Sequence, residues 1–199
     1  MQKPYAESCD QNKDPIFAVI KSYLIERSSV LEIGSGTGQH AIYFAEKLPH
    51  LTWYTSDREQ YHNGIIQWLD EAKLTNARKP FLLDVSRSSW PETTVDAVFS
   101  ANTSHIMHWH DVQATFSGVG KILNDDGIFL LYGPFNFAGK YTSESNQQFD
   151  YRLKSRDPMS GIRNFEDLDQ LANQAGLQFQ KVFDMPCNNK ILSWQKTNR

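Results

Sequence analysis

Residues 30–38 read Val30-Leu31-Glu32-Ile33-Gly34-Ser35-Gly36-Thr37-Gly38, and this stretch decides how the chain folds. Its apolar beginning predicts a short strand over 29–33. Glycines at every second position predict a tight turn whose backbone can approach a ligand, since no Cβ atoms stand in the way. Apolar residues then return at helical spacing until Pro49. A strand, a glycine turn and a helix in direct succession are the structural context of a nucleotide-type binding site.

The rest of the sequence continues this alternation. It predicts a first helix that begins at Asp14-Pro15, strands at 51–56, 81–83, 95–100 and 128–132, and helices around 65–72, 116–123 and 168–175. Alternating strands and helices imply an α/β fold with a mostly parallel sheet. Two strands around Asn188-Asn189 predict an antiparallel hairpin at the C-terminal end.

The composition fits one globular domain. The chain has 199 residues, a formal net charge of −3 and 40 % hydrophobic residues, with no linker or repeat that would divide it. We therefore expect a single domain over 1–199. The near-neutral charge gives no support to nucleic-acid binding. No apolar stretch approaches about 18 residues and no secretory signal is recognisable, so we expect a cytoplasmic protein without a membrane span. Cys9 and Cys187 are isolated, so we expect reduced thiols.

The spacing of the glycine turn separates two classes of ligand. A dinucleotide fingerprint would place its third glycine at position 39, but that residue is Gln39 and the third glycine is Gly38. Glu32 also brings a carboxylate close to the turn, where it would repel a pyrophosphate and attract a cation. These features favour a positively charged cofactor and disfavour a nicotinamide oxidoreductase.

Residues 32–38 resemble the first motif of the class I methyltransferases that use S-adenosylmethionine (AdoMet). The resemblance implies a doubly wound, seven-stranded sheet that ends with one antiparallel strand. It also implies that Asp57 contacts the ribose hydroxyls and that Asp84, with Val85 beside it, contacts the adenine. Residues 96–102 resemble the fourth motif, which ends at Asn102 near the methyl group. The cofactor contacts implied are Glu32, Gly34, Ser35, Gly36, Thr37, Gly38, Asp57, Asp84, Val85 and Asn102.

A narrower resemblance extends along the chain. Segments 12–13, 102–106, 131–135, 145–146, 149–150, 157–158, 161–163 and 185–189 resemble a poorly characterised methyltransferase-like family of bacteria and animals. This family implies no particular acceptor.

Ligands of open α/β sheets bind beyond the carboxyl ends of the strands, so we expect the acceptor near Asn102 and His105, which are our candidate catalytic residues. The segment 136–163 is too long for a simple connection. We expect it to fold over the cofactor as a substrate lid, with Phe135, Tyr141 and Phe149 as apolar walls. The alternative is an ordinary surface insertion.

The sequence therefore predicts methyl transfer from AdoMet to a small molecule or an exposed side chain. The alternative is an AdoMet-binding scaffold or sensor without turnover. His105, His108 and His110 have no nearby carboxylate except Asp111, so we expect no metal. Asn102 is not followed by the Pro-Pro-aromatic sequence typical of enzymes that methylate nucleobase amines, which disfavours adenine methylation in DNA.

Overall fold

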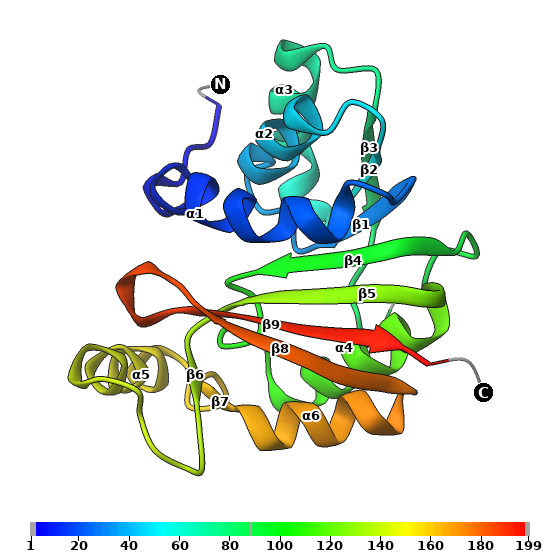
Figure 1. The fold of residues 1–199 in the computed structure, drawn as a ribbon. Coiled ribbons are helices and arrows are strands. Elements are labelled where there is room, and N and C mark those ends of the chain that lie inside the picture. Colours follow the sequence, from blue (N-terminus) through cyan, green and yellow to red (C-terminus); the bar gives the residue numbers. More distant parts are fainter. Residues whose placement is uncertain (1–2, 88, 198–199) are drawn as a thin grey trace.

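A seven-stranded sheet forms the centre of the computed structural model, which describes residues 3–87 and 89–197 (Figure 1). The strand order is β3-β2-β1-β4-β5-β9-β8. Strand β9 pairs antiparallel with β5 on one side and with β8 on the other, and the remaining pairs of the described sheet are parallel. The strands are β1 Ser29–Ile33, β2 Thr52–Asp57, β3 Ala77–Leu82, β4 Val95–Ala101, β5 Leu123–Gly133, β8 Leu177–Asp184 and β9 Lys190–Lys196. The predicted fold class is confirmed.

Six α-helices lie in the described part of the chain. They are α1 Glu7–Leu24, α2 Gln39–Lys47, α3 Glu59–Ala72, α4 Trp109–Ile122, α5 Glu144–Arg156 and α6 Phe165–Gln174. The short strands β6 Phe135–Asn136 and β7 Arg163–Asn164 form a separate parallel pair, and a 3-10 turn, η1 Pro186–Asn188, lies in the terminal hairpin. No helix in the described ranges is both long and apolar enough to cross a membrane.

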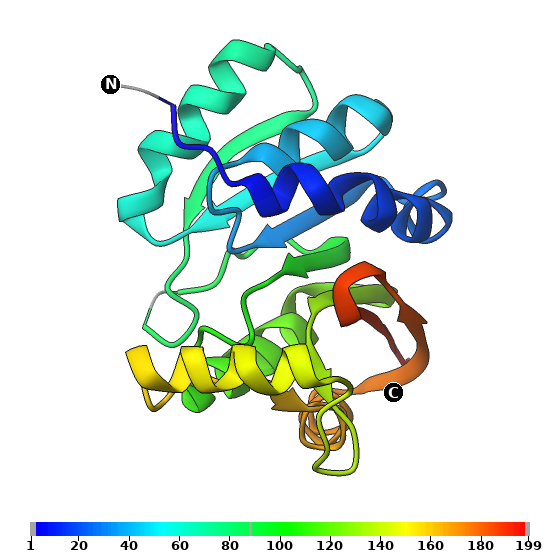
Figure 2. The ribbon, with the colours of Figure 1, turned by 90° about the vertical axis from the view of Figure 1, so that its left-hand side faces the viewer.

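Alternate side chains of the central strands enter two hydrophobic cores, one on each face of the sheet. In β1, Val30 packs with α1 and α2, whereas Leu31 and Ile33 pack with α4 and α6. This alternation follows from the two-residue period of a strand. In Figure 2, α1, α2 and α3 lie together in the upper half of the view, and α4, α5 and α6 lie in the lower half. Helices on both faces make the sheet doubly wound, as predicted.

Three predicted boundaries are wrong. The first helix begins at Glu7, not at Asp14, so Pro15 lies inside α1. Contacts with α2 hold its early turns, because Asn12 Oδ1 lies 2.7 Å from His40 Nε2 and Tyr43 donates a hydrogen bond to Asp14. Strand β3 begins at Ala77, before Pro80, which an edge strand tolerates. Strand β5 continues through the predicted turn at 125–127, with Asp126 at φ 62°.

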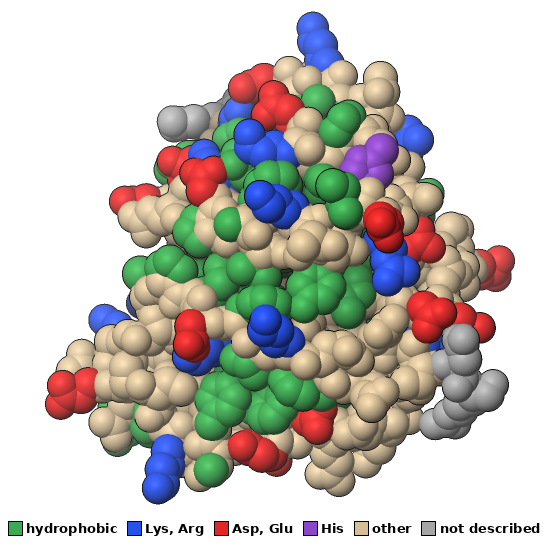
Figure 3. All heavy atoms as spheres, in the orientation of Figure 1, with side chains coloured by type: hydrophobic (Ala, Val, Ile, Leu, Met, Phe, Trp, Pro, Cys, Tyr) green, Lys and Arg blue, Asp and Glu red, His purple; other side chains and the backbone are tan. Residues whose placement is uncertain are grey.

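The terminal hairpin leaves one face of the sheet partly apolar. Figure 3 shows hydrophobic side chains in a band across the middle of the face seen in Figure 1, with charged side chains around it. Phe183 of β8 packs edge-on against Tyr23 of α1, with 5.9 Å between ring centroids. Lys181 lies 4.8 Å above the same Phe183 ring, so its side chain covers part of this surface.

A buried carboxyl group lies below the glycine turn. Glu32 is only 2 % exposed, and its Oε2 accepts hydrogen bonds from Ser35 Oγ at 2.8 Å and from Trp53 Nε1 at 3.2 Å. Burial raises the pKa of Glu32 to about 7, well above its ordinary value, and outweighs these two hydrogen bonds. Because the folded-state pKa lies above the unfolded one, the stability that Glu32 contributes is present at acid pH and is lost as the pH rises through 7.

Replacing this carboxyl group should therefore change the pH dependence of stability. We expect Glu32→Gln to shift the free energy of unfolding, relative to wild type, by about 2 kcal/mol in favour of the variant between pH 5 and pH 8. Urea denaturation at both pH values measures this shift, and Glu46→Gln, at an exposed position of α2, is the matched control. A difference between wild type and Glu32→Gln that is the same at both pH values would contradict the account.

Candidate functional site

A cavity of about 780 Å³ opens beyond the carboxyl ends of β1, β2, β3 and β4. The chain runs from β1 outward to β2 and β3, and then returns to β4 on the other side of β1. The cavity therefore lies at the switch point where open α/β sheets bind their ligands. Most of the predicted site residues line it: Gly34, Ser35, Gly36, Thr37, Asp57, Asp84, Val85 and Asn102.

The glycine turn is tied closely to the neighbouring strands. The backbone amides of Gly34 and Ser35 both donate to the Ser56 carbonyl at 3.0 Å. Gly34 has φ 72°, and a Cβ atom there would lie 2.6 Å from Thr103 Cγ2. Position 34 therefore requires glycine for both its backbone conformation and its space. The turn has a fixed shape that leaves its backbone open to the cavity.

Asp57 presents a fixed carboxylate beside this turn. Its Oδ2 accepts a hydrogen bond from the Gly36 amide at 2.8 Å, and its Oδ1 accepts one from the Arg58 amide at 2.8 Å. Burial raises the pKa of Asp57, and these two amides oppose that shift. Each carboxylate oxygen has a further lone pair, so Asp57 can still accept hydrogen bonds from hydroxyl groups in the cavity.

Two residues of the predicted cofactor site do not line the cavity. Glu32 lies beneath the turn, where it accepts a hydrogen bond from Ser35 Oγ and supports the turn without reaching the cavity. Gly38 has φ 92° at the N-terminus of α2, and a Cβ atom there would lie 3.2 Å from Ile65 Cα in α3. Gly38 therefore permits close packing of two helices.

The structure also places His105 outside the cavity lining. Asn102 has φ 58°, and its amide donates to the Tyr132 carbonyl at 2.9 Å. The turn that follows directs Thr103 and Met107 toward the cavity and His105 against Phe149, with 5.3 Å between ring centroids. Burial lowers the pKa of His105 to about 4, so its imidazole is neutral near pH 7, and its Nδ1 has no hydrogen-bond partner.

The segment 136–163 packs at the same edge of the sheet as the cavity. Asp157 Oδ2 lies 2.7 Å from His108 Nε2, and the Gly161 amide donates to the His105 carbonyl at 2.8 Å. Of this segment, only Asp157 lines the cavity. The expected apolar walls are elsewhere, because Phe135 is fully buried, Tyr141 donates to Asp150, and Phe149 packs on His105.

One wall of the cavity is the N-terminal strap, which we define as residues 3–9 and which no local sequence pattern indicates. Pro4, Ala6, Ser8 and Cys9 of the strap line the cavity. The Ala6 amide donates to Gln39 Oε1 at 2.6 Å, and Trp68 Nε1 of α3 donates to the Pro4 carbonyl at 2.8 Å. Figure 2 shows the strap running along α3. The strap therefore closes the cavity on the side of α2 and α3.

The strap depends on a glycine in α3. A Cβ atom at Gly64 would lie 2.6 Å from Pro4 Cγ, so the strap occupies the space that a side chain would need. Lys3 continues this contact, because its Nζ lies 3.5 Å above the Trp68 ring and 2.7 Å from Glu71 Oε2. Burial is the main cause that raises the pKa of the Cys9 thiol to about 11, with Glu32 adding to it.

A small side chain at position 64 should therefore displace the strap and expose Cys9. In a Cys187→Ser background, which removes the exposed thiol, we expect Gly64→Ala to increase the rate of Cys9 alkylation several-fold, because a displaced strap restores an ordinary thiol. Asn63→Ala, on the exposed surface of the same helix, is the matched control. Equal alkylation rates in the two variants would show that the strap does not shield Cys9.

Several solved methyltransferase structures have a similar fold. An O-methyltransferase family protein from Burkholderia thailandensis matches with a TM-score of 0.82 and 12 % identity, over 94 % of this chain and 56 % of that one. The S-adenosylmethionine-dependent methyltransferase SibL in its apo form matches with a TM-score of 0.81 and 18 % identity, over 96 % of this chain and 56 % of that one. An O-methyltransferase family 2 protein from Planctomyces limnophilus in complex with apigenin matches with a TM-score of 0.81 and 12 % identity, over 96 % of this chain and 60 % of that one. The chain spans little more than half the length of these proteins. At such identities the similarity establishes the Rossmann-like methyltransferase fold.

A family model covers nearly the whole chain. It is described as "Protein of unknown function (DUF938)" and matches residues 3–196, a range that includes the glycine turn, Asp57 and the segment 136–163. The occurrence of the family in bacteria and animals stays a prediction. With this match and the methyltransferase fold, the chain belongs to the DUF938 family.

Proposed function

We propose that this protein binds AdoMet in the cavity and transfers its methyl group to a small molecule or an exposed side chain. The observation that carries the proposal is the Asp57 carboxylate, which two backbone amides hold beside a glycine turn in a methyltransferase fold. A fixed acceptor of this kind suits a pair of vicinal hydroxyl groups, such as those of a ribose.

The residues of the cavity fit this cofactor. Asp57 would accept hydrogen bonds from the ribose, and Asp84 and Val85, which follow β3, would contact the adenine. The backbone at Gly34 and Gly36 would lie against the methionine portion of the cofactor. Sequence position and cavity lining both support these roles.

The charge near the turn favours a cationic ligand. Asp57 and Asp84 line the cavity, together with Arg58 and Arg87, and Asp57 is the carboxylate that is hydrogen-bonded to the turn. A sulfonium or an ammonium group is stabilised by these carboxylates, whereas the pyrophosphate of a dinucleotide is repelled. This distinction supports AdoMet over a nicotinamide cofactor.

Bound AdoMet supplies an already activated methyl group, so the protein has to orient the acceptor and exclude water. Asn102 lies at the end of β4, lines the cavity, and has its backbone fixed through the Tyr132 carbonyl. We assign it to holding the acceptor close to the cofactor. His105 lies behind the same turn, so we revise its proposed role from catalytic to positioning.

The acceptor would enter where β4 leads into α4. Ile106, Met107 and His108 line this part of the cavity, and Asp157 of the segment 136–163 contacts His108 there. We propose that the segment acts as a lid through Asp157, while its aromatic residues support the turn at 102–108. The Planctomyces limnophilus protein was solved in complex with apigenin, which supports a small-molecule acceptor for this fold.

Calorimetric titration tests the choice of cofactor. We expect S-adenosylhomocysteine and AdoMet to bind with micromolar dissociation constants and NAD to show no saturable binding, because the Asp57 carboxylate beside the turn would repel its pyrophosphate. Binding of NAD without AdoMet would contradict the proposal. Transfer of labelled methyl groups to acceptors in cell extracts then distinguishes an enzyme from an AdoMet-binding scaffold.

The role of Asp57 can be tested separately. We expect Asp57→Ala to weaken S-adenosylhomocysteine binding by about 1–3 kcal/mol, since the ribose hydroxyls lose a charged acceptor, and Asp57→Asn to have a smaller effect. Asp70→Ala, at an exposed position of α3, is the matched control. An Asp57→Ala variant that folds and binds S-adenosylhomocysteine like wild type would show that Asp57 does not contact the ribose.

A further inference from the structure

We propose that His108, His110 and Asp111 bind a divalent transition-metal ion at the mouth of the cavity, with Asp157 orienting His108. The metal site stands independently of AdoMet. Its use, which is to hold an oxygen-bearing acceptor, rests on the proposed methyl transfer. From the sequence we expected no metal, because Asp111 was the only carboxylate near these histidines. In the fold, Asp157 is a second carboxylate beside them.

The three ligands come from one turn of backbone at the start of α4. His108 is the N-cap residue of this helix, and His110 and Asp111 lie in its first turn. One potential ligand atom of each residue lies within 4.8 Å of those of the other two. Metal–ligand bonds of about 2.0–2.2 Å separate ligand atoms by roughly 3–4.4 Å, so small side-chain rotations would suffice. His110 is exposed, and its Nε2 already lies 3.0 Å from Asp111 Oδ1, so these two side chains are close to the spacing that a shared ion needs.

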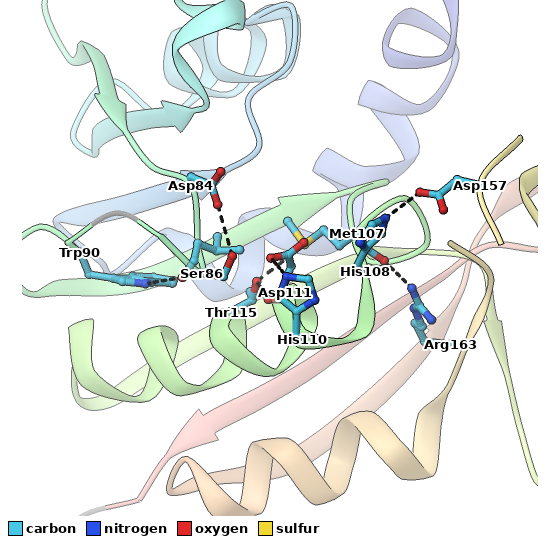
Figure 4. A network of polar contacts seen from close by, with 11 residues as sticks. Asp84, Ser86, Trp90, Met107, His108, His110, Asp111, Thr115, Asp157 and Arg163 are labelled. Carbon is cyan, nitrogen blue, oxygen red and sulfur yellow. Dashed lines mark hydrogen bonds and ion pairs between the residues drawn. The ribbon is translucent and has the colours of Figure 1, made fainter. Parts of the chain in front are cut away.

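Asp157 approaches the same group from a distant part of the sequence (Figure 4). Its Oδ2 lies 2.7 Å from His108 Nε2, and its Oδ1 accepts a hydrogen bond from the Met159 amide at 3.0 Å. This pair leaves His108 Nδ1 as the ligand atom. A carboxylate on the second ring nitrogen is the usual partner of a metal-bound histidine, because it fixes the ring orientation and raises the basicity of the ligand.

The nearest arginine does not neutralise this cluster of side chains. Arg163 Nε donates to the Ser104 carbonyl at 3.1 Å, and its Nη2 donates to the carbonyls of Met107 and Met159. Its guanidinium also lies 5.8 Å from the Trp109 ring centroid. These contacts direct the Arg163 guanidinium to backbone carbonyls rather than into an ion pair with Asp111 or Asp157, although its charge also acts on Asp157.

The ligand set indicates the class of metal. Two imidazoles and a carboxylate suit Zn²⁺, Co²⁺ or Mn²⁺ better than Mg²⁺ or Ca²⁺, which prefer oxygen ligands. Three protein ligands leave at least one coordination position open. All three residues and Asp157 line the cavity, so that position would face the proposed acceptor. An acceptor oxygen on the metal would be held in place and made more acidic.

Titration of the metal alone tests the site. The Cys187→Ser protein, treated with a chelator, is titrated with Co²⁺ and followed by calorimetry and visible absorption. We expect one ion per chain and a spectrum without thiolate bands. We expect His110→Ala and Asp111→Ala to weaken binding at least about tenfold, and Asp157→Asn to weaken it by about 10–100-fold. His50→Ala, whose histidine lies outside the cavity, should bind like the parent.

Two results would overturn the metal site: no binding at millimolar Co²⁺, or equal affinities in the parent and in folded His110→Ala and Asp111→Ala variants. The open position is tested with acetohydroxamate, a small bidentate oxygen ligand, which should shift the Co²⁺ spectrum where acetamide does not. An unchanged spectrum would overturn the role in acceptor binding. None of these measurements contains AdoMet, so their failure is distinct from a failure of the proposed function.

Discussion

The carboxyl end of β1 is held between its two neighbouring strands, and the cavity depends on this constraint. Ser100 Oγ of β4 donates to the Ile33 carbonyl at 2.8 Å, and Ser56 Oγ of β2 donates to the Glu32 carbonyl at 2.7 Å. The Ser56 carbonyl then accepts the first two amides of the glycine turn. These bonds fix where the turn leaves the sheet. Asp57 and Asn102, at the ends of the neighbouring strands, consequently face the same cavity.

The parts of the fold that were predictable from the sequence are those that local pattern determines. The succession of a strand, a glycine turn and a helix at 29–48 predicted a nucleotide-type binding site, and the alternation that follows predicted a mostly parallel α/β sheet. The doubly wound, seven-stranded form was implied by the resemblance to the class I methyltransferases. Asp57 could be identified through the methyltransferase resemblance, and it ends the strand after the turn, where register brings it to the cavity. In each case the pattern that supports the prediction lies within one helix, strand or turn and the segments next to it in the sequence.

The parts that were not predictable depend on contacts between distant segments. The N-terminal strap reaches the cavity only because Gly64 leaves room for Pro4 and Trp68 binds its carbonyl, and no periodicity of residues 3–9 indicates this. The orientation of His105 follows from the left-handed backbone at Asn102, which sequence alone does not specify. Asp157 meets His108 across 49 residues of sequence, so spacing arguments about metal ligands could not include it.

The cavity has two parts, and the central claim concerns the part between β1 and β3, where the turn and Asp57 would bind AdoMet. A crystal structure of the complex with S-adenosylhomocysteine tests this claim most directly. The account predicts that both ribose hydroxyls lie within hydrogen-bond distance of Asp57, with the amino-acid portion over Gly34 and Gly36. A nucleoside bound elsewhere, or an Asp57 carboxylate with no ligand contact in the occupied cavity, would contradict it.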